Sequence, residues 1–98
     1  MEDKALGSFI WDSGKEWVNL LKHNVDFVTA AEAFKDPDVK IYIDSKHSGQ
    51  EERFFCVGKV DTRILTVRFT YRKNKIRILG AGYWRKGRRL YEEKNDRS

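Results

Sequence analysis

Basic and aromatic residues that could bind and cleave RNA are concentrated between Thr62 and Tyr91. This stretch contains no acidic residue, but ten basic ones: Arg63, Arg68, Arg72, Lys73, Lys75, Arg77, Arg85, Lys86, Arg88 and Arg89. Residues 1–61 are different, with eight Lys/Arg against twelve Asp/Glu. Interleaved aromatic residues, among them Trp84, could stack on unpaired bases while the cations bind phosphate. The stretch therefore predicts a nucleic-acid-binding surface, and a face kept soluble by its charge is the alternative.

The same side chains could also cleave RNA without a metal ion. In that reaction the 2′-hydroxyl attacks the adjacent phosphorus, and the protein holds the strand in line and stabilises charge on the phosphoryl oxygens. Arginine suits this task because its planar fork binds phosphate bidentately and stays protonated. The residues alone thus predict an RNA-binding protein and leave cleavage as an open alternative.

Other chemistries have little support in the sequence. Two histidines 24 positions apart and one cysteine give none of the usual metal-ligand spacings. Neither a phosphate-binding loop nor a dinucleotide fingerprint is present, and no nucleophilic triad is suggested. We therefore expect no metal and no cofactor.

Residue periodicity predicts an α+β fold with a mainly antiparallel sheet. In Arg63–Arg72, Leu65 and Val67 share one face with Phe69 and Tyr71, while Ile64, Thr66, Arg68, Thr70 and Arg72 share the other. A turn at 72–75 leads to a second strand, Lys75–Gly82, in which Ile76 and Ile78 oppose Lys75 and Arg77. The remaining predicted elements are a short strand (Ser8–Asp12), two helices (Lys15–His23 and Phe27–Lys35), two strands (Val39–Asp44 and Arg53–Val60) and a last helix (Trp84–Lys94).

Length and composition indicate one small folded domain. The chain has 98 residues, 40% of them hydrophobic, with a formal net charge of +5. The N-terminus lacks the basic and apolar regions of a signal peptide, and no apolar run could span a membrane. We expect a cytoplasmic protein in which the single cysteine, Cys56, is a buried thiol.

The order and spacing of many short matches give a family likeness. The chain resembles the BrnT toxins of bacterial type II toxin–antitoxin pairs over nearly its full length. The matching residues are Phe9-x-Trp11-Asp12, Lys15, Asn19, Lys22-His23-x-Val25-x-Phe27, Phe34-x-Asp36-Pro37, Asp44, His47-Ser48, Glu51-Glu52-Arg53, Val57-Gly58, Phe69-Thr70-x-Arg72, Ile76-Arg77-Ile78 and Arg89-x-Tyr91-Glu92.

This resemblance implies a RelE-like fold and an endoribonuclease that blocks translation. It also implies a hetero-oligomer with a cognate BrnA-like antitoxin, which neutralises the toxin and carries a ribbon-helix-helix domain. Operator DNA would be contacted through that antitoxin. One departure stands out: where the family usually reads Ile-Ser-Ala-Arg, this chain has Leu79-Gly80-Ala81-Gly82. Either Arg85 supplies the missing charge, or activity is weak or lost.

We therefore predict a metal-independent ribonuclease toxin acting on single-stranded RNA. The expected site residues are Arg53, Arg72, Arg77 and Arg85 for phosphate and transition-state charge, His23 and Tyr91 for proton transfer or stacking, and Arg68, Lys75, Lys86, Arg88 and Arg89 for RNA binding. Simpler roles are an ion pair with Glu51 for Arg53 and a core-edge contact for Tyr91. The alternative functions are a non-catalytic nucleic-acid-binding module and a protein-interaction module that uses the basic sheet face.

Overall fold

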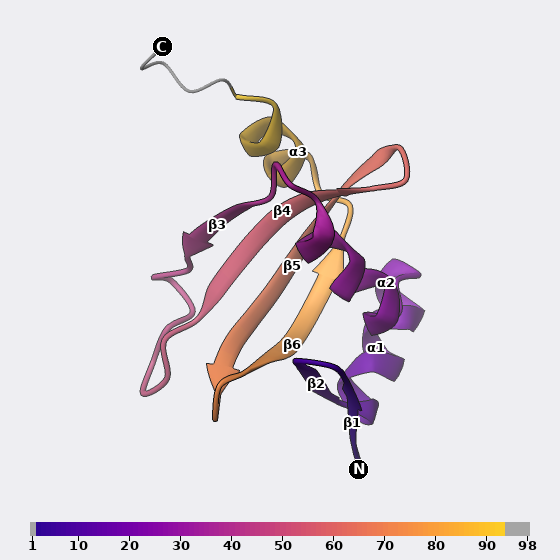
Figure 1. Ribbon diagram of the computed structural model, residues 1–98, viewed down its shortest axis with the longest axis vertical. Helices are drawn as coiled ribbons and strands as arrows, with labels where there is room; N and C mark the ends of the chain where they lie inside the picture. The colour runs from indigo at the N-terminus through magenta and orange to yellow at the C-terminus, as the bar shows by residue number, and fades with distance from the viewer. Residues whose placement is uncertain (1, 94–98) are drawn as a thin grey trace.

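The computed structural model describes residues 2–93, which form a six-stranded sheet with helices on both faces (Figure 1). In order, the elements are β1 (Asp3–Leu6), β2 (Phe9–Asp12), α1 (Ser13–His23), α2 (Phe27–Glu32), the 3₁₀ turn η1 (Ala33–Lys35), β3 (Lys40–Ile43), β4 (Phe54–Val60), β5 (Arg63–Arg72), β6 (Lys75–Gly82) and α3 (Arg85–Glu92). The predicted α+β class is confirmed. Lys94, at the end of the last predicted helix, lies outside the described residues.

The strands follow the order β1-β2-β6-β5-β4-β3. Only β2 and β6 run parallel, and every other neighbouring pair is antiparallel. The two strands and the turn predicted between 63 and 82 have the predicted bounds. The first strand, β1, was not predicted, because all four of its residues are exposed and show no apolar alternation. It covers the outer edge of β2, and the chain turns between them at Gly7, whose φ is +59°.

Side-chain caps fix the ends of the first two helices. Asp12 accepts a hydrogen bond from the Lys15 amide, and Asp26 accepts one from the Thr29 amide. Asn24 ends α1 in the left-handed conformation with φ 57°. The first helix begins two residues earlier than predicted. No described helix has the length and apolar character needed to cross a membrane.

One face of the sheet carries the hydrophobic core under α2 and η1. Leu65, Val67, Phe69 and Ile78 are fully buried there against Phe27 of α2. This is the apolar face that the strand alternation predicted. Cross-strand pairs also place the cations as predicted: Arg68 lies opposite Gly80, Thr70 opposite Arg77 and Arg72 opposite Lys75, all on the other face.

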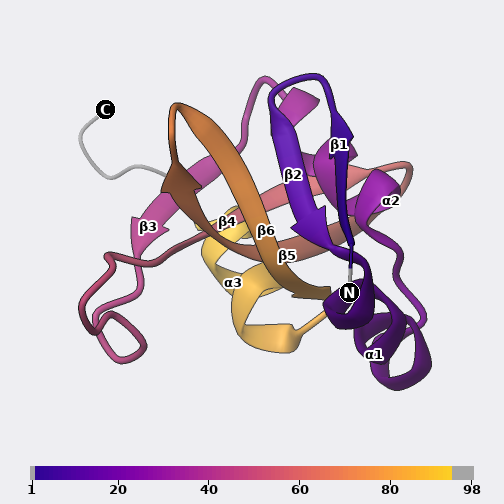
Figure 2. The same ribbon diagram turned by 90° about the horizontal axis from the view of Figure 1, so that it is seen from below.

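That second face is not the open basic surface expected from the sequence. The helix α3 packs across its β4–β5 part, as Figure 2 shows, and buries Ile64 and Thr66. Close packing occurs at Gly87, since a Cβ there would collide with Thr66 and lie 3.1 Å from the Val57 side chain. The face left open therefore starts at Arg68. On the core face, Tyr71 is 51% exposed, because the strands extend beyond the covering helices.

Cys56 lies on β4 with no exposed surface. Burial raises the pKa of its thiol to about 12. A thiol with such a pKa stays protonated near neutral pH, which makes it a poor nucleophile. The prediction of a buried thiol is confirmed.

Candidate active site

The buried side chain of Asn19 fixes α1 against the end of β6. Its amide nitrogen donates to the carbonyls of Val25 and Ala81 at 3.0 and 2.9 Å, and its oxygen accepts from the Ala81 amide at 3.0 Å. The paired residues of β2 reach β6 only at 76–78, so Asn19 takes the place of a strand neighbour at Ala81. The last turn of α1 is thereby held beside the open part of the sheet.

This arrangement forms a cavity of about 350 Å³ between α1 and β6, called the α1–β6 cavity below. Its lining residues are Asp12, Gly14, Lys15, Val18, Asn19, Lys22, His23, Arg68 and Leu79. Asp12 is the only carboxylate among them, and it already accepts the Lys15 amide at 2.9 Å as the helix cap. The cavity is therefore suited to an anionic ligand.

Arg68 is a cation of this cavity with a buried nitrogen that lacks a hydrogen-bond partner. Its guanidinium lies against the backbone of Gly80, where a Cβ would be 2.5 Å from Nη2. Within residues 2–93, its buried Nε has no hydrogen-bond partner and its guanidinium forms no ion pair. A buried polar atom without a partner is rare in folded proteins. An anion in the cavity would form charge-assisted hydrogen bonds with the other nitrogens of this guanidinium.

His23 enters the same cavity from the end of α1. Its ring meets the indole of Trp84 edge-on, with centroids 5.1 Å apart and planes at 82°. The indole in turn covers Gly82, where a Cβ would lie only 2.6 Å from the Trp84 ring. The two glycines near the end of β6 thus make room for two side chains, Arg68 over one and Trp84 over the other.

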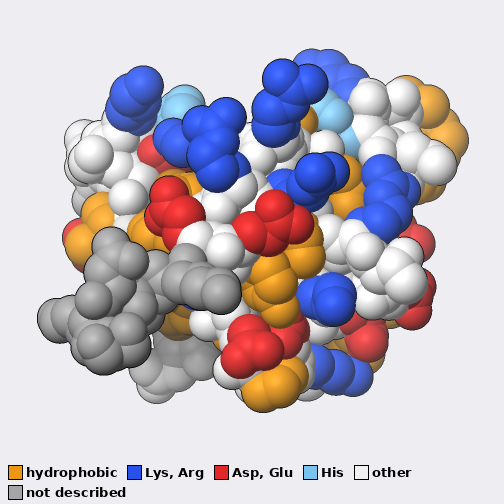
Figure 3. All heavy atoms as spheres, turned by 90° about the horizontal axis from the view of Figure 1, so that it is seen from above, with side chains coloured by type: hydrophobic (Ala, Val, Ile, Leu, Met, Phe, Trp, Pro, Cys, Tyr) orange, Lys and Arg blue, Asp and Glu red, His pale blue; other side chains and the backbone are white. Residues whose placement is uncertain are grey.

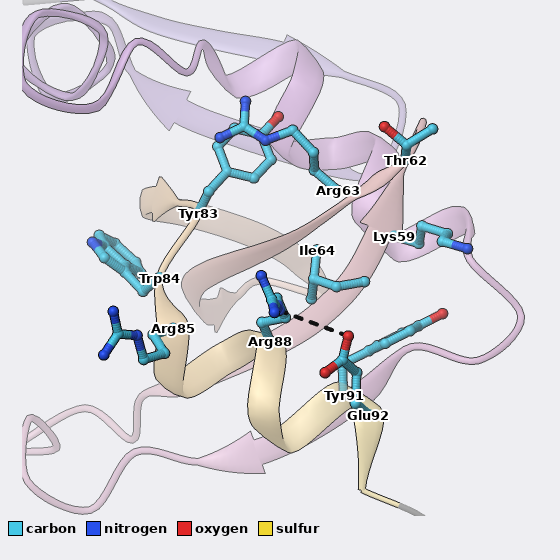
Figure 4. A pocket seen from close by; sticks show the side chains of 10 residues that line it. All are labelled: Lys59, Thr62, Arg63, Ile64, Tyr83, Trp84, Arg85, Arg88, Tyr91 and Glu92. Carbon is cyan, nitrogen blue, oxygen red and sulfur yellow. Dashed lines mark ion pairs between the residues drawn. The ribbon is translucent and has the colours of Figure 1, made fainter.

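A second, larger cavity of about 990 Å³ lies beside α3 (Figure 4) and is called the α3 cavity. It is lined by Lys59, Thr62, Arg63, Ile64, Tyr83, Trp84, Arg85, Arg88, Tyr91 and Glu92. Trp84 separates it from His23 of the α1–β6 cavity. In the view from above, Lys and Arg side chains gather on one side of the molecule with histidine among them (Figure 3).

A comparison of the sequence with known protein families assigns the chain to one of them. The family described as "Ribonuclease toxin, BrnT, of type II toxin-antitoxin system" matches residues 11–87. The chain belongs to the BrnT family. That description implies a ribonuclease toxin with an antitoxin partner. Among curated proteins, no sequence matches the chain significantly.

The four arginines predicted for the BrnT-type site do not share either of the two cavities. Arg72 pairs with Glu51 at 2.9 Å, so the predicted alternative of a Glu51 pair for Arg53 is not observed. Arg77 pairs with Asp3 of β1 at 3.1 Å, and this hydrogen bond lowers the pKa of the Asp3 carboxyl. Arg53 lies just before β4, its amide held by a loop serine. The fourth, Arg85, lines the α3 cavity.

Four of the seven other predicted residues line one of the two cavities. His23 and Arg68 share the α1–β6 cavity, while Arg88 and Tyr91 line the α3 cavity with Arg85. The Tyr91 hydroxyl donates to Asp36 at 2.6 Å, which raises the pKa of Tyr91 to about 12. Lys86 and Arg89 are exposed on α3 and line neither cavity, and Lys75 donates to the Gly7 carbonyl at 3.4 Å.

Asn19, Gly80 and Lys22 were not predicted to have a site role. Asn19 left a misleading signal in the sequence, because it falls on the polar side of the helix, opposite the stripe of Trp17, Leu20 and Leu21. Gly80 left none, since its role depends on a side chain from the neighbouring strand.

In the described part of the chain, no group of three or more His, Cys, Asp or Glu is arranged to hold a metal ion.

Proposed function

We propose that this chain is a metal-independent endoribonuclease toxin that cleaves single-stranded RNA in the α1–β6 cavity. One observation carries the proposal: in a chain of a ribonuclease toxin family, Arg68 lies in a cation-lined cavity beside His23 without an ion-pair partner in residues 2–93. A phosphodiester is the anion that such a protein would bind there.

The proposed reaction needs positioning, proton transfer and charge stabilisation. The 2′-oxygen attacks the adjacent phosphorus and loses its proton, and the bond from phosphorus to the 5′-oxygen breaks as that oxygen gains a proton. The products are a 2′,3′-cyclic phosphate and a 5′-hydroxyl. Both proton transfers can be served by imidazole, so we assign His23 to one of them. Arg68 donates to the non-bridging oxygens, where charge increases in the transition state.

Other cations have supporting roles in this proposal. Lys22 lines the same cavity and adds positive potential near the phosphate. Arg72 and Arg77 already bond to carboxylates, so their use by RNA requires an exchange of partners. Tyr91 bonds to Asp36 with a hydroxyl that stays protonated at neutral pH, and we assign it a structural role.

We further propose that a cognate ribbon-helix-helix antitoxin neutralises the toxin by covering its basic face, and that operator DNA is contacted through that antitoxin. The family description supports an antitoxin partner. Acidic antitoxin residues would suit the cation-rich surface of residues 72–91. A complex that leaves both cavities open would count against this mode of inhibition.

The test of the enzyme uses purified protein, labelled single-stranded RNA and EDTA. Wild-type protein should cleave, and both Arg68→Ala and His23→Ala should slow cleavage by about 10²-fold or more, as for loss of one transition-state donor. Arg72→Ala is the matched comparison, since it removes the same charge from the same face of β5, and it should slow cleavage much less.

Two results would overturn the proposal. Cleavage that stops in EDTA and returns with a divalent cation would contradict metal independence. Equal losses in Arg68→Ala and Arg72→Ala would show that only total charge matters, and not the cavity. Arg68→Lys adds a further check, because it keeps the charge but loses the bidentate fork.

A further inference from the structure

The α3 cavity collects positive charge that has no assigned use. Lys59, Arg63, Arg85 and Arg88 line it, with Glu92 as the only carboxylate. The Arg88–Glu92 contact is 3.7 Å long between side chains that are 69% and 62% exposed. Such a surface pair contributes little, so Arg88 can turn to another anion. The other three cations form no ion pair within residues 2–93.

Arg63 is already held in position for a ligand. Its guanidinium carbon lies 3.7 Å from the centroid of the Tyr83 ring. A guanidinium stacked in this way interacts with the ring through its flat face and keeps its N–H groups free at the edge. Figure 4 shows this pair at one side of the cavity, with Arg85 and Arg88 on α3. The cavity therefore has a pre-positioned donor as well as charge.

The start of α3 favours an anion for a second reason. Trp84 precedes the helix without a side-chain cap, and the first turn carries no acidic residue. The first helical amides have no intrahelical acceptor, and the helix dipole is positive at this end. Cations such as Arg85 are unfavourable there, and a bound phosphate would offset both effects.

Trp84 lies between the two cavities. Its indole lines the α3 cavity and meets the ring of His23, which lines the α1–β6 cavity. An aromatic wall between two cation-lined cavities matches a single strand of nucleic acid, in which phosphates alternate with bases that stack on aromatic rings. A carboxylate-rich peptide would use the charges but not the ring.

We propose that the α3 cavity is a second RNA subsite, in which Arg63, Arg85 and Arg88 bind a phosphate of a nucleotide that flanks the cleaved bond. The strand passes Trp84 on its way from one cavity to the other. The link to cleavage rests on the proposed function, but binding in the α3 cavity does not.

The experiment compares two double variants of α3 in the full-length protein. Arg85→Ala/Arg88→Ala removes two cations that line the cavity, and Lys86→Ala/Arg89→Ala removes two from the same helix that do not. Binding of a fluorescent eight-nucleotide RNA with a non-cleavable 2′-deoxy linkage at the scissile position is measured at several salt concentrations. Binding of a dinucleotide with the same linkage is measured as well, because this ligand is too short to fill both cavities.

The cavity variant should bind the longer RNA about tenfold or more weakly at 0.15 M salt, as for lost charge-assisted hydrogen bonds. Its salt slope should fall by about 0.7, the value for one lost phosphate contact on a single strand. Dinucleotide binding should stay near the wild-type value, and the comparison variant should change much less. Wild-type protein and the two double variants should show similar thermal unfolding.

Equal weakening in the two double variants would overturn the proposal, because only net charge would then matter. So would unchanged RNA binding together with weaker antitoxin binding by the cavity variant, which would make the cavity a protein-docking site. If wild-type protein fails to cleave RNA but the cavity variant still binds the longer RNA selectively less well, the proposed enzyme fails and the second subsite stands.

Discussion

Substitution of Gly80 by Ala tests the position of Arg68 without removing its charge. A Cβ at residue 80 would lie 2.5 Å from Nη2 of Arg68, 3.2 Å from Cζ and 3.3 Å from Nε. Since non-bonded heavy atoms prefer separations of about 3.5 Å or more, the guanidinium must move by about 1 Å. A misplacement of about 1 Å can cost 10²-fold in rate. We expect Gly80→Ala to slow cleavage by about that factor.

The fold should tolerate this change, because the Cβ meets the far end of a flexible side chain and the φ of Gly80 is not left-handed. Loss of a glycine also restricts the unfolded chain, which stabilises a compatible site by about 0.4–1 kcal/mol. Urea unfolding should therefore place the variant within about 1 kcal/mol of wild type, and RNA affinity should fall less than the single-turnover rate. Gly49→Ala is the control, since nothing lies within 4 Å of its added Cβ. A wild-type cleavage rate in folded Gly80→Ala protein would refute the assignment of Arg68.

Three further predictions concern groups that support the site. Gly82→Arg should lower both the cleavage rate and the melting temperature, because even its Cβ would lie 2.6 Å from the Trp84 ring. Increased activity would show instead that the absence of an arginine at this position weakens the wild-type enzyme. Asn19→Ala should lower the free energy of unfolding by about 2 kcal/mol or more in urea titrations, since it leaves buried backbone groups of β6 unpaired; an unchanged midpoint would refute this anchoring role. Tyr91→Phe should lower stability by about 1 kcal/mol at pH 7. Partial burial opposes the shift, but the hydrogen bond from Tyr91 helps to lower the pKa of Asp36 below 3.8. The stability difference between wild type and variant should therefore be full between pH 3.8 and pH 10.0. It should vanish as the pH falls through the lowered pKa of Asp36, or rises through the Tyr91 pKa of about 12. A difference independent of pH would contradict this pairing.

The sequence predicted the central hairpin accurately because two signals agree there. Apolar alternation marks the core face, and the cations fill the other face of the same strands. The first helix shows where periodicity fails. Trp17 and Leu21 form an apolar stripe that predicts burial, yet they are 58% and 68% exposed. Because α1 sits at the end of β6 and contacts it through Asn19, its packing depends on tertiary position and not on its own pattern.

The candidate site was predictable in chemistry and less so in membership. His23 and Arg68 are 45 positions apart, and only the fixed contact between α1 and β6 brings them into one cavity. In the sequence, Gly80 and Gly82 appear only as departures from the expected family pattern. In the folded chain they leave space for the guanidinium of Arg68 and the indole of Trp84, and no local sequence rule predicts these contacts.

The distribution of acidic residues explains why total charge was a poor guide to individual roles. Residues 62–91 contain no carboxylate, but four carboxylates from outside this stretch contact it: Glu51 contacts Arg72, Asp3 contacts Arg77, Asp36 contacts Tyr91 and Glu92 contacts Arg88. For RNA to use Arg72 or Arg77, its phosphate must displace a carboxylate and gains only the difference between two similar bonds. A phosphate at Arg68 displaces none of these carboxylates, because the Arg68 guanidinium forms no ion pair within residues 2–93. Carboxylates thus already pair with Arg72 and Arg77, whereas Arg68 has no such partner within residues 2–93. An anion is therefore expected to bind in the cavity that Arg68 shares with His23.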